Sequence, residues 1–340
     1  MRSGLTLLFL LLQVNLVFGT TTCLENRAAF DIGSGSVKIL VASVNFCEHK
    51  IEKVFLNESK KIGFQSDLEK SIDNKFSSTI QTEAIKLFKE LMSQAESYHP
   101  VKYSAVATAA FRKAANTNDF VKLVDKELSL KIKVIEQQEE AKLGHAALIS
   151  QLTLNNSVPK KPIVVWDIGS GSMQITSKNE KNEFEFNYLG TLASVTFKNR
   201  VITDILKKDI HKVNSPNPIG KDNVKSAFRL IKKETSTAFQ PSFLSFLKNA
   251  EIYGIGGVHA SSILNQISKA SNNSPLKKYT LDDLLKAIEI KALKNDQELG
   301  GEYAATDVTN LILVAGFMQT MSINTINVEK INLTNGLILE

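Results

Sequence analysis

The chain has 340 residues, which is enough for two domains with separate hydrophobic cores. Its composition, 43% hydrophobic and 22% charged residues, is that of an ordinary globular protein and excludes a low-complexity chain. The net charge of +6 raises the local concentration of anionic ligands but identifies none of them, because a basic excess also serves solubility.

Residues 1–19 have the features of a secretory signal peptide. Met1 and Arg2 supply a positive start, and the apolar run Leu5–Phe18 that follows is too short to span a bilayer. We therefore predict cleavage after Gly19 and an exported protein, periplasmic or secreted, with no stable membrane insertion after cleavage. An uncleaved anchor helix is the alternative.

The first half of the mature chain contains three predicted strands, followed by alternating helices and strands. Apolar and β-branched runs predict the strands, and apolar residues three or four positions apart predict the helices. In chain order these are strands Arg27–Asp31, Val37–Val44 and Ile51–Phe55, helix Ser77–Tyr98, strand Tyr103–Ala109, helix Thr117–Leu128, strand Lys131–Ile135 and helix Gln138–Gln151. A polar, turn-rich stretch, Thr153–Lys161, then links two domains, which we place at residues 24–152 and 160–340.

The two cysteines, Cys23 and Cys47, flank the first predicted hairpin. If strands 27–31 and 37–44 pair through a turn at 33–36, each cysteine lies 12 residues from the hairpin centre near residue 35. We therefore predict a disulfide between them, which export permits. Two free thiols are the alternative.

The second half begins with the same order of elements as the first. Its predicted elements are strands Ile163–Asp167, Ser172–Ser177 and Phe184–Tyr188, helices around 192–208 and 221–236, strand Glu251–Ile255, helices Gly257–Ile267, Leu281–Leu293 and Ala305–Met321, and strand Ile323–Val328. Thr280 and Asp283 have the spacing of a capping box at the start of the helix over 281–293. The restart after the link predicts a duplicated α/β chain.

The hexapeptide DIGSGS occurs once in each half, at Asp31–Ser36 and at Asp167–Ser172, directly after an apolar strand. Gly-rich turns allow backbone N–H groups to approach a phosphate closely, and flanking hydroxyls add uncharged donors. One such turn is often only a hairpin, but two identical copies in matching halves predict two loops that hold a polyanion across a cleft. The predicted phosphate-binding residues are Gly33, Ser34, Gly35, Ser36, Gly169, Ser170, Gly171 and Ser172, and Asp31 and Asp167 are predicted to hold Mg²⁺.

Three other stretches place polar or glycine residues at the ends of predicted strands. Gly256 and Gly257 can form a further phosphate- or nucleotide-facing turn, or only a tight connection. Arg112 can bind a phosphate bidentately, or lie in solvent. Glu139 and Glu140 begin a helix, where acids often only complement the helix dipole; in a cleft, a carboxylate would activate water for phosphoanhydride hydrolysis. The five histidines lack metal-ligand spacing, and the sequence has no P-loop, serine-hydrolase elbow or nucleic-acid-binding motif.

Six blocks of the sequence resemble, in their order, those of the exopolyphosphatase/guanosine-pentaphosphate phosphatase (Ppx/GppA) family, within the superfamily of actin, sugar kinases and acetate kinase. The blocks are AAFDIGSGSVKILVA, ATAAFRKAANTNDFV, IKVIEQQEEAKLGHAAL, IVVWDIGSGSMQI, YGIGGVHASSI, and LILVAGFMQTM followed by INVEKINLTNGLIL. The resemblance extends from about residue 27 to residue 338. It implies an α/β fold of two duplicated actin-like (ribonuclease H-like) lobes with a phosphate-binding cleft between them. We also expect the last helix, predicted over 305–321, to pack back toward the first lobe.

The resemblance further implies hydrolysis of terminal phosphates from polyphosphate or a phosphorylated guanine nucleotide, with Mg²⁺ or another divalent cation. The family's catalytic glutamate falls on Glu140, and Glu139 is the next candidate. Its metal- and phosphate-facing aspartate falls on Asp167, its first-loop aspartate on Asp31, and its arginine on Arg112. Polyphosphate or a phosphorylated nucleotide is the implied partner, no nucleic-acid readout is expected, and a homodimer is possible.

The chain departs from the family pattern at several positions. Gly35 stands in place of Asn, Met173-Gln174 in place of Thr-Glu, and Val258 in place of Thr. The tail reads Leu-Thr-Asn-Gly, at residues 333–336, where the family has Leu-Arg-Glu-Gly. Gln174 stays a predicted metal ligand, but the loss of a carboxylate there weakens the expected metal binding.

Gln174 also points to the secreted apyrases, which share the superfamily and carry Gln at this position. Their Gly-Ala-Thr-Ala-Gly-x-Arg stretch resembles ATAAFR, although they are longer and rich in disulfides. Three functions stay open, in this order of preference: an exported exopolyphosphatase, an apyrase-like nucleotide phosphohydrolase, and a protein that kept the fold to bind a phosphorylated ligand.

Overall fold

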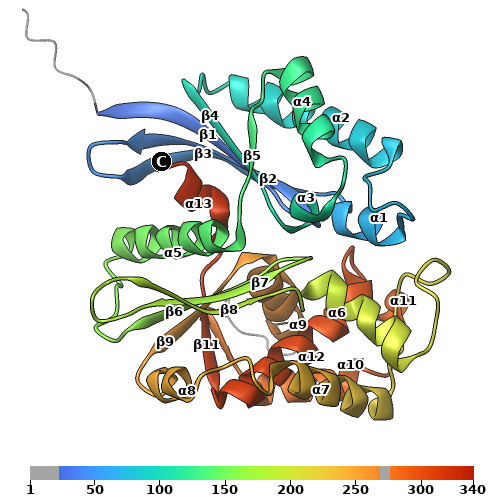
Figure 1. The fold of residues 1–340 in the computed structure, drawn as a ribbon. Coiled ribbons are helices and arrows are strands. Elements are labelled where there is room, and N and C mark those ends of the chain that lie inside the picture. Colours follow the sequence, from blue (N-terminus) through green and yellow to red (C-terminus); the bar gives the residue numbers. More distant parts are fainter. Residues whose placement is uncertain (1–22, 269–275) are drawn as a thin grey trace, which may run out of the picture.

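The computed structural model describes residues 23–268 and 276–340, so the predicted signal peptide lies outside the described residues. These residues form two lobes, each built on its own β-sheet, and one helix lies between the sheets (Figure 1). None of the described helices is both long enough and apolar enough to cross a bilayer.

The first lobe contains a five-stranded sheet in the order β3-β2-β1-β4-β5. Strands β1, β2 and β3 are antiparallel neighbours, whereas β4 runs parallel to β1 and β5 runs parallel to β4. The elements are β1 (Leu24–Ile32), β2 (Ser36–Asn45), β3 (Lys50–Lys61), α1 (Phe64–Lys70), α2 (Ser78–Glu96), β4 (Lys102–Ala107), α3 (Ala109–Lys113), α4 (Thr117–Leu128), β5 (Ile132–Val134) and α5 (Gln137–Leu154). Helices α2 and α4 cover one face of this sheet, and α5 lies on the other (Figure 1).

The second lobe contains a six-stranded sheet in the order β10-β11-β9-β6-β7-β8. Its strands are β6 (Ile163–Ile168), β7 (Met173–Lys178), β8 (Phe184–Gly190), β9 (Glu251–Ile255), β10 (Lys278–Thr280) and β11 (Thr325–Val328). Its helices are α6 (Ser194–Arg200), α7 (Lys221–Thr235), α8 (Pro241–Leu247), α9 (Leu264–Ser268), α10 (Leu281–Lys291), α11 (Asp296–Leu299) and α12 (Ala304–Met321), and α13 (Leu333–Leu337) ends the chain. Two π-helical turns, η1 (Val201–Ile205) and η2 (Val258–Ile263), extend α6 and precede α9.

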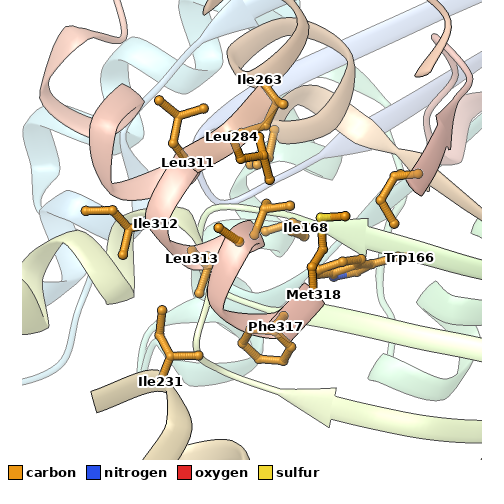
Figure 2. Packing of buried hydrophobic residues seen from close by; sticks show 14 of the residues in the cluster. Trp166, Ile168, Ile231, Ile263, Leu284, Leu311, Ile312, Leu313, Phe317 and Met318 are labelled. Carbon is orange, nitrogen blue, oxygen red and sulfur yellow. The ribbon is translucent and has the colours of Figure 1, made fainter. Parts of the chain in front are cut away.

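Helix α12 runs through the core of the second lobe, as Figure 2 shows. Its residues Leu311, Phe317 and Met318 are fully buried, and the ring of Phe317 lies 5.8 Å from that of Trp166 on β6. A helix that is apolar on all sides is stable only inside a core, so the continuous apolar run of α12 determines its central position.

Helices α5 and α13 connect the lobes. Leu143 of α5 packs with Leu333 of α13 against the first sheet, whereas Leu148 of α5 packs against the second sheet. Helix α13 approaches α5 closely at Gly336, where a Cβ would overlap the backbone carbonyl of α5. The helix predicted over 305–321 therefore does not pack back toward the first lobe, because its apolar surface is held by the second core; the short helix α13 packs there instead.

The predicted disulfide between Cys23 and Cys47 is confirmed. Their Cα atoms lie 5.6 Å apart at the end of the β1–β2 hairpin that is opposite the turn. The Phe46 N–H also donates to the carbonyl oxygen of Cys23 (2.9 Å), so the strand pairing itself places the two sulfurs together.

The predicted order of longer elements is confirmed along the chain. Helix α4 and strand β9 occupy the predicted ranges, and the capping box at Thr280 and Asp283 is formed. The sequence analysis missed α1, α3, α8, α11, α13 and β10, each of which has seven residues or fewer. So short a segment shows too little periodicity to be distinguished from a loop.

Candidate active site

The two DIGSGS segments form equivalent turns. In the first, the Gly33 N–H donates to the carbonyl oxygen of Ser36, and in the second, the Gly169 N–H donates to that of Ser172, both at 2.9 Å. The internal duplication predicted from the sequence is therefore repeated in the backbone hydrogen bonds of the turns.

The strand register beside each turn is also equivalent. Asp31 lies opposite Lys38 across β1 and β2, and Asp167 lies opposite Gln174 across β6 and β7. Residues directly opposite in an antiparallel pair have their side chains on the same face, with Cβ atoms about 5 Å apart. The hairpin register therefore places a charged residue, Lys38, opposite Asp31 and a neutral residue, Gln174, opposite Asp167.

The start of a helix supports each turn. The N–H of Gln65, in the first turn of α1, donates to the carbonyl oxygen of Ser34 (2.8 Å), and the N–H of Val195, in the first turn of α6, donates to that of Ser170 (3.0 Å). The Ser34 hydroxyl also accepts from the N–H of Ala110 in α3 (2.9 Å). These bonds hold each turn rigidly on its own lobe.

The two turns face each other and approach closely at glycines. A Cβ at Gly35 would overlap the Ser170 hydroxyl, and a Cβ at Gly171 would lie 3.2 Å from Ser34 Oγ. Gly35 is one of the departures from the family pattern, and any side chain at this position would have to displace Ser170. The turns come this close because both positions lack a side chain.

Polar contacts between the lobes accompany this close approach. Lys61 Nζ donates to the carbonyl oxygen of Glu302 (2.9 Å), and Lys70 Nζ donates to Asn214 Oδ1 (2.8 Å). The structure therefore shows the two lobes in contact through exposed polar bonds as well as at the turns.

A cavity of about 500 Å³ lies between the lobes. The predicted site residues that line it are Asp31, Gly33, Ser34, Gly35, Ser36, Glu140, Asp167, Gly169, Ser170, Gly171, Ser172, Gly256 and Gly257. The predicted residues outside its lining are Glu139, Arg112 and Gln174. Lys38, Thr108 and Tyr303 also line it, although the sequence analysis did not single them out.

Glu140 lies in the first turn of α5 and is only 6% exposed. Arg112 Nη1 donates to its Oε2 at 2.9 Å. Burial raises the pKa of Glu140 to about 6, although the positive charge of Arg112 opposes this shift. At neutral pH the side chain is therefore ionised yet more basic than an ordinary carboxylate, as a general base requires.

Arg112 contacts protein groups rather than the cavity. Its Nη1 also donates to the carbonyl oxygen of Ile135 (2.7 Å), and its Nη2 lies 3.4 Å from Ser172 Oγ. In this structure the guanidinium is not part of the cavity lining and bonds Glu140 instead, and the phosphate contact of Arg112 stays a prediction. The reason is the position of Ile135, directly after β5, which takes up a donor of the guanidinium.

Glu139 faces away from the cavity and forms an ion pair with Lys133 on the surface. Successive residues of an α-helix point about 100° apart, so α5 can direct only one of the two glutamates into the cleft. Of the two glutamates only Glu140 lines the cavity, so Glu140 stays the preferred prediction for the base.

Asp167 is half-buried on the cavity wall. Burial, together with the negative charge of Glu140, raises the pKa of Asp167 to about 7. Within the described residues no lysine, arginine or histidine forms an ion pair with it. Gly256 has a φ of +79°, and a Cβ there would overlap Asp167 Oδ1, so this turn requires glycine for two reasons.

Lys38 is the functional residue that the sequence analysis missed. Its Nζ bonds Asp31 Oδ2 at 2.6 Å, and it lines the cavity. Burial lowers the pKa of Lys38, but the charges of Asp31, Asp167 and Glu140 outweigh this and raise it above its ordinary value. The duplication could have indicated Lys38, because it is the second residue after the first DIGSGS, as Gln174 is after the second.

Gln174 is buried behind the cavity wall. Its Nε2 donates to Ser172 Oγ (3.2 Å), and its Oε1 has no hydrogen-bond partner among the described residues. Gln174 is not part of the cavity lining in this structure, and its role as a metal ligand stays a prediction. The β-hairpin register places it directly opposite Asp167.

The family resemblance implies a divalent cation at this site. Across residues 23–268 and 276–340, no three His, Cys, Asp or Glu side chains are grouped so that they could hold a metal. Mg²⁺, however, is usually held by one or two carboxylates together with water and substrate phosphates. Asp167 fits this mode because it is a cavity-facing carboxylate without an ion-pair partner in the described chain. Asp31, in contrast, already forms an ion pair with Lys38.

The cavity also extends along a polar wall of the second lobe, formed by Ser262, Gln266 and Asn310. The amide nitrogens of Asn310 and Gln266 both donate to Ser262 Oγ, at 3.1 and 3.3 Å. Their buried oxygens have no partner among the described residues. Buried acceptors are normally satisfied, so this wall suits a ligand with N–H or O–H donors.

Comparisons with known proteins agree with this fold. The model of the Ppx/GppA phosphatase family matches residues 49–340. A bifunctional 3-dehydroquinate synthase/phosphatase of Fusobacterium nucleatum is 30% identical over 161 residues, which is 45% of this chain but only 23% of that protein.

Two crystal structures share the fold over almost the whole chain. The Aquifex aeolicus Ppx/GppA family member has a TM-score of 0.70 at 19% identity and covers 93% of this chain and 97% of its own. An exopolyphosphatase from Cytophaga hutchinsonii has a TM-score of 0.70 at 16% identity, with 92% and 96% covered. The predicted pair of actin-like lobes is thereby confirmed, as is the predicted enzyme class, a phosphohydrolase acting on acid anhydrides. Since the family model matches most of the sequence, the chain belongs to the Ppx/GppA phosphatase family.

Proposed function

We propose that the chain is an exported exopolyphosphatase that releases terminal phosphate from polyphosphate. The observation that carries this proposal is the pair of Gly/Ser turns, one from each lobe, that face each other at a single cavity also lined by Glu140 and Asp167. Polyphosphate presents phosphates and no other group for recognition, so phosphate-binding turns on both sides of a cavity match its chemistry.

Glu140 accepts the proton of the attacking water in this mechanism. Arg112 bonds Oε2, which leaves Oε1 as the oxygen that orients the water. The water oxygen attacks the terminal phosphorus, the bond from phosphorus to the bridging oxygen breaks, and the shortened polyphosphate leaves with that oxygen.

The negative charge of the substrate is balanced by both lobes. Lys38 and the hydroxyls of Ser34 and Ser172 line the cavity as donors. A divalent cation held by Asp167 and substrate oxygens would neutralise further phosphate charge.

Phosphate release from long-chain polyphosphate, ATP and pppGpp, measured side by side with Mg²⁺, tests the substrate. We expect polyphosphate to have the highest kcat/KM. Preference for a nucleotide would contradict this assignment, and binding of all three without any turnover would contradict an enzymatic role altogether.

Glu140→Gln tests the base. Loss of a general base costs about 10²- to 10⁴-fold in kcat, while tripolyphosphate binding, measured by calorimetry, should stay close to wild type. Glu139→Gln is the matched control, because it removes an acid one residue away that faces the surface, and it should retain full activity. Equal losses in both variants would refute the assignment.

A nucleotide phosphohydrolase is the second candidate. The specific observation in its favour is the polar wall with the unpartnered oxygens of Gln266 and Asn310, which could accept hydrogen bonds from a base or ribose. If nucleotides are substrates, Asn310→Leu should raise KM for ATP or pppGpp and leave KM for polyphosphate unchanged.

Export is supported by the apolar run Leu5–Phe18 and by the disulfide, since disulfides persist in oxidising compartments. We expect the mature protein to begin at Thr20 and to be recovered from the periplasm or the medium. An intact Met1 on protein recovered from the cytosol would refute export.

A further inference from the structure

Three of the carboxylates that line the cavity belong to the two turns and to the start of α5, and they differ in their pairing with positive charge. Asp31 is paired with Lys38 at 2.6 Å, and Glu140 is paired with Arg112 at 2.9 Å. Asp167 has no such partner in the described part of the chain. Of these three carboxylates, the one without an ion-pair partner therefore lies on the second lobe.

This difference comes from one position of the duplicated hairpin. Lys38 and Gln174 each stand seven residues after the aspartate of their turn, since 38 − 31 and 174 − 167 are both seven. The register places each of them directly opposite that aspartate. The bond that closes each turn and one bond from a helix start are repeated in both lobes, whereas the residue opposite the aspartate differs in charge between the two turns.

A lysine at this position competes with a divalent cation. The Asp31 carboxylate is 2% exposed and its Oδ2 is already bonded to the ammonium group, so Mg²⁺ could bind there only by displacing Lys38. The neutral amide of Gln174 offers no such competition to Asp167. Its Oε1 is buried and has no partner among the described residues.

We propose that Lys38 and Gln174 give the two turns different roles. Lys38 acts as a permanent cation in the first turn, which binds phosphate without a metal, and Asp167 in the second turn binds a single divalent cation. The chain would thus hold one metal ion per molecule, with the lysine in the place of a second. This proposal rests on the proposed binding of phosphate by the turns, but not on which anhydride is hydrolysed.

An exchange of the two residues tests the proposal. Lys38→Gln gives the first hairpin the residue of the second, and Gln174→Lys gives the second hairpin the residue of the first. Mn²⁺ binding is measured by electron paramagnetic resonance and by calorimetry without substrate, so the result does not depend on activity. We expect one Mn²⁺ in the wild type, two in Lys38→Gln, and in Gln174→Lys an affinity about 10- to 100-fold weaker.

The double exchange, Lys38→Gln with Gln174→Lys, should again bind one Mn²⁺, now at Asp31. Adding Asp31→Asn to the double exchange should then abolish binding, whereas in the wild-type background Asp31→Asn should leave the single Mn²⁺ in place.

Size-matched neutral variants control for packing. Lys38→Met should gain the second Mn²⁺ like Lys38→Gln, and Gln174→Met should keep the single site. Binding of tripolyphosphate without metal should weaken in both Lys38 variants and persist in Gln174→Met.

The proposal is overturned if Lys38→Gln and Lys38→Met still bind one Mn²⁺, or if Gln174→Lys binds Mn²⁺ as tightly as the wild type. Failure of the proposed function would look different: the cation counts would follow the expectation, and polyphosphate would not be hydrolysed by the wild type.

Discussion

Replacing Arg112 with glutamine should shift the pH dependence of the enzyme rather than weaken its binding of phosphate. Arg112 Nη1 donates to Glu140 Oε2 at 2.9 Å, and the two side chains are only 14% and 7% exposed. A hydrogen bond to a charged group contributes about 1.5–3 kcal/mol, which corresponds to about one to two pKa units. Because Arg112 lowers the pKa of Glu140, its loss should raise that pKa from about 6 by this amount.

The direction of the effect on activity follows from the role of Glu140 as a base. A base works only when it is ionised, so the rate rises as the pH passes upward through its pKa. In the wild type this rise is expected near pH 6. In Arg112→Gln it moves up by about one to two pH units, so kcat/KM falls about 10- to 100-fold at low pH and recovers in alkaline solution.

The assay is the profile of kcat/KM for polyphosphate between about pH 5 and pH 9. Arg112→Lys keeps the charge and should shift the profile less. Lys113→Gln removes a neighbouring exposed charge that forms no ion pair with Glu140 and should leave the profile unchanged. If Arg112→Gln instead raises KM equally at every pH, Arg112 binds phosphate in the working enzyme and the reasoning is refuted.

Three further predictions concern stability. Asp167→Asn should raise Tm at pH 8 in a chelator by about 1–3 °C, because the buried charge is lost, and by less at pH 5. The pKa of about 7 against the usual 3.8 places the penalty above pH 4, and cavity water reduces it to about 1–2 kcal/mol. A gain that does not grow with pH in a thermal melt would contradict this cause. Gly336→Ala should cost about 1–3 kcal/mol in denaturant titration, because the backbone of α5 blocks the new methyl group, whereas Gly63→Ala, which has room, should be near neutral. Replacing Cys23 and Cys47 by serine should cost about 3 kcal/mol for the 24-residue separation and leave kcat unchanged, since the disulfide is at the hairpin end opposite the turn; a large loss of kcat would contradict this.

Much of the candidate site could be predicted from the sequence because it is built from turns. The glycines and serines of both DIGSGS segments and the Gly256-Gly257 turn all line the cavity. Each lies at the end of an apolar strand, and the ends of neighbouring parallel strands meet at one edge of a sheet. Glu139 and Glu140 were singled out for a related reason, because they begin the helix that follows such a strand, and the family resemblance then selected Glu140.

What the sequence left open concerns residues whose partners lie far along the chain. Arg112 was predicted to contact phosphate, and only the structure shows that it bonds Ile135 and Glu140. Lys38 was not identified, because only the hairpin register shows that it faces Asp31. The helix predicted to return to the first lobe was the wrong one, because α13 is too short to have a recognisable pattern.

The sequence by itself determined the duplication, the two turns, the disulfide and the choice of longer helices and strands. These features depend on repeated sequence motifs and on the periodicity of apolar residues over short segments. Local conformation and solvent exposure determine both. Only the tertiary structure decided which glutamate faces the cavity, which aspartate is already paired, and how closely the turns approach. Those properties depend on charges and packing between segments that are distant in the chain, so DIGSGS, although identical in both lobes, forms two sites of different charge.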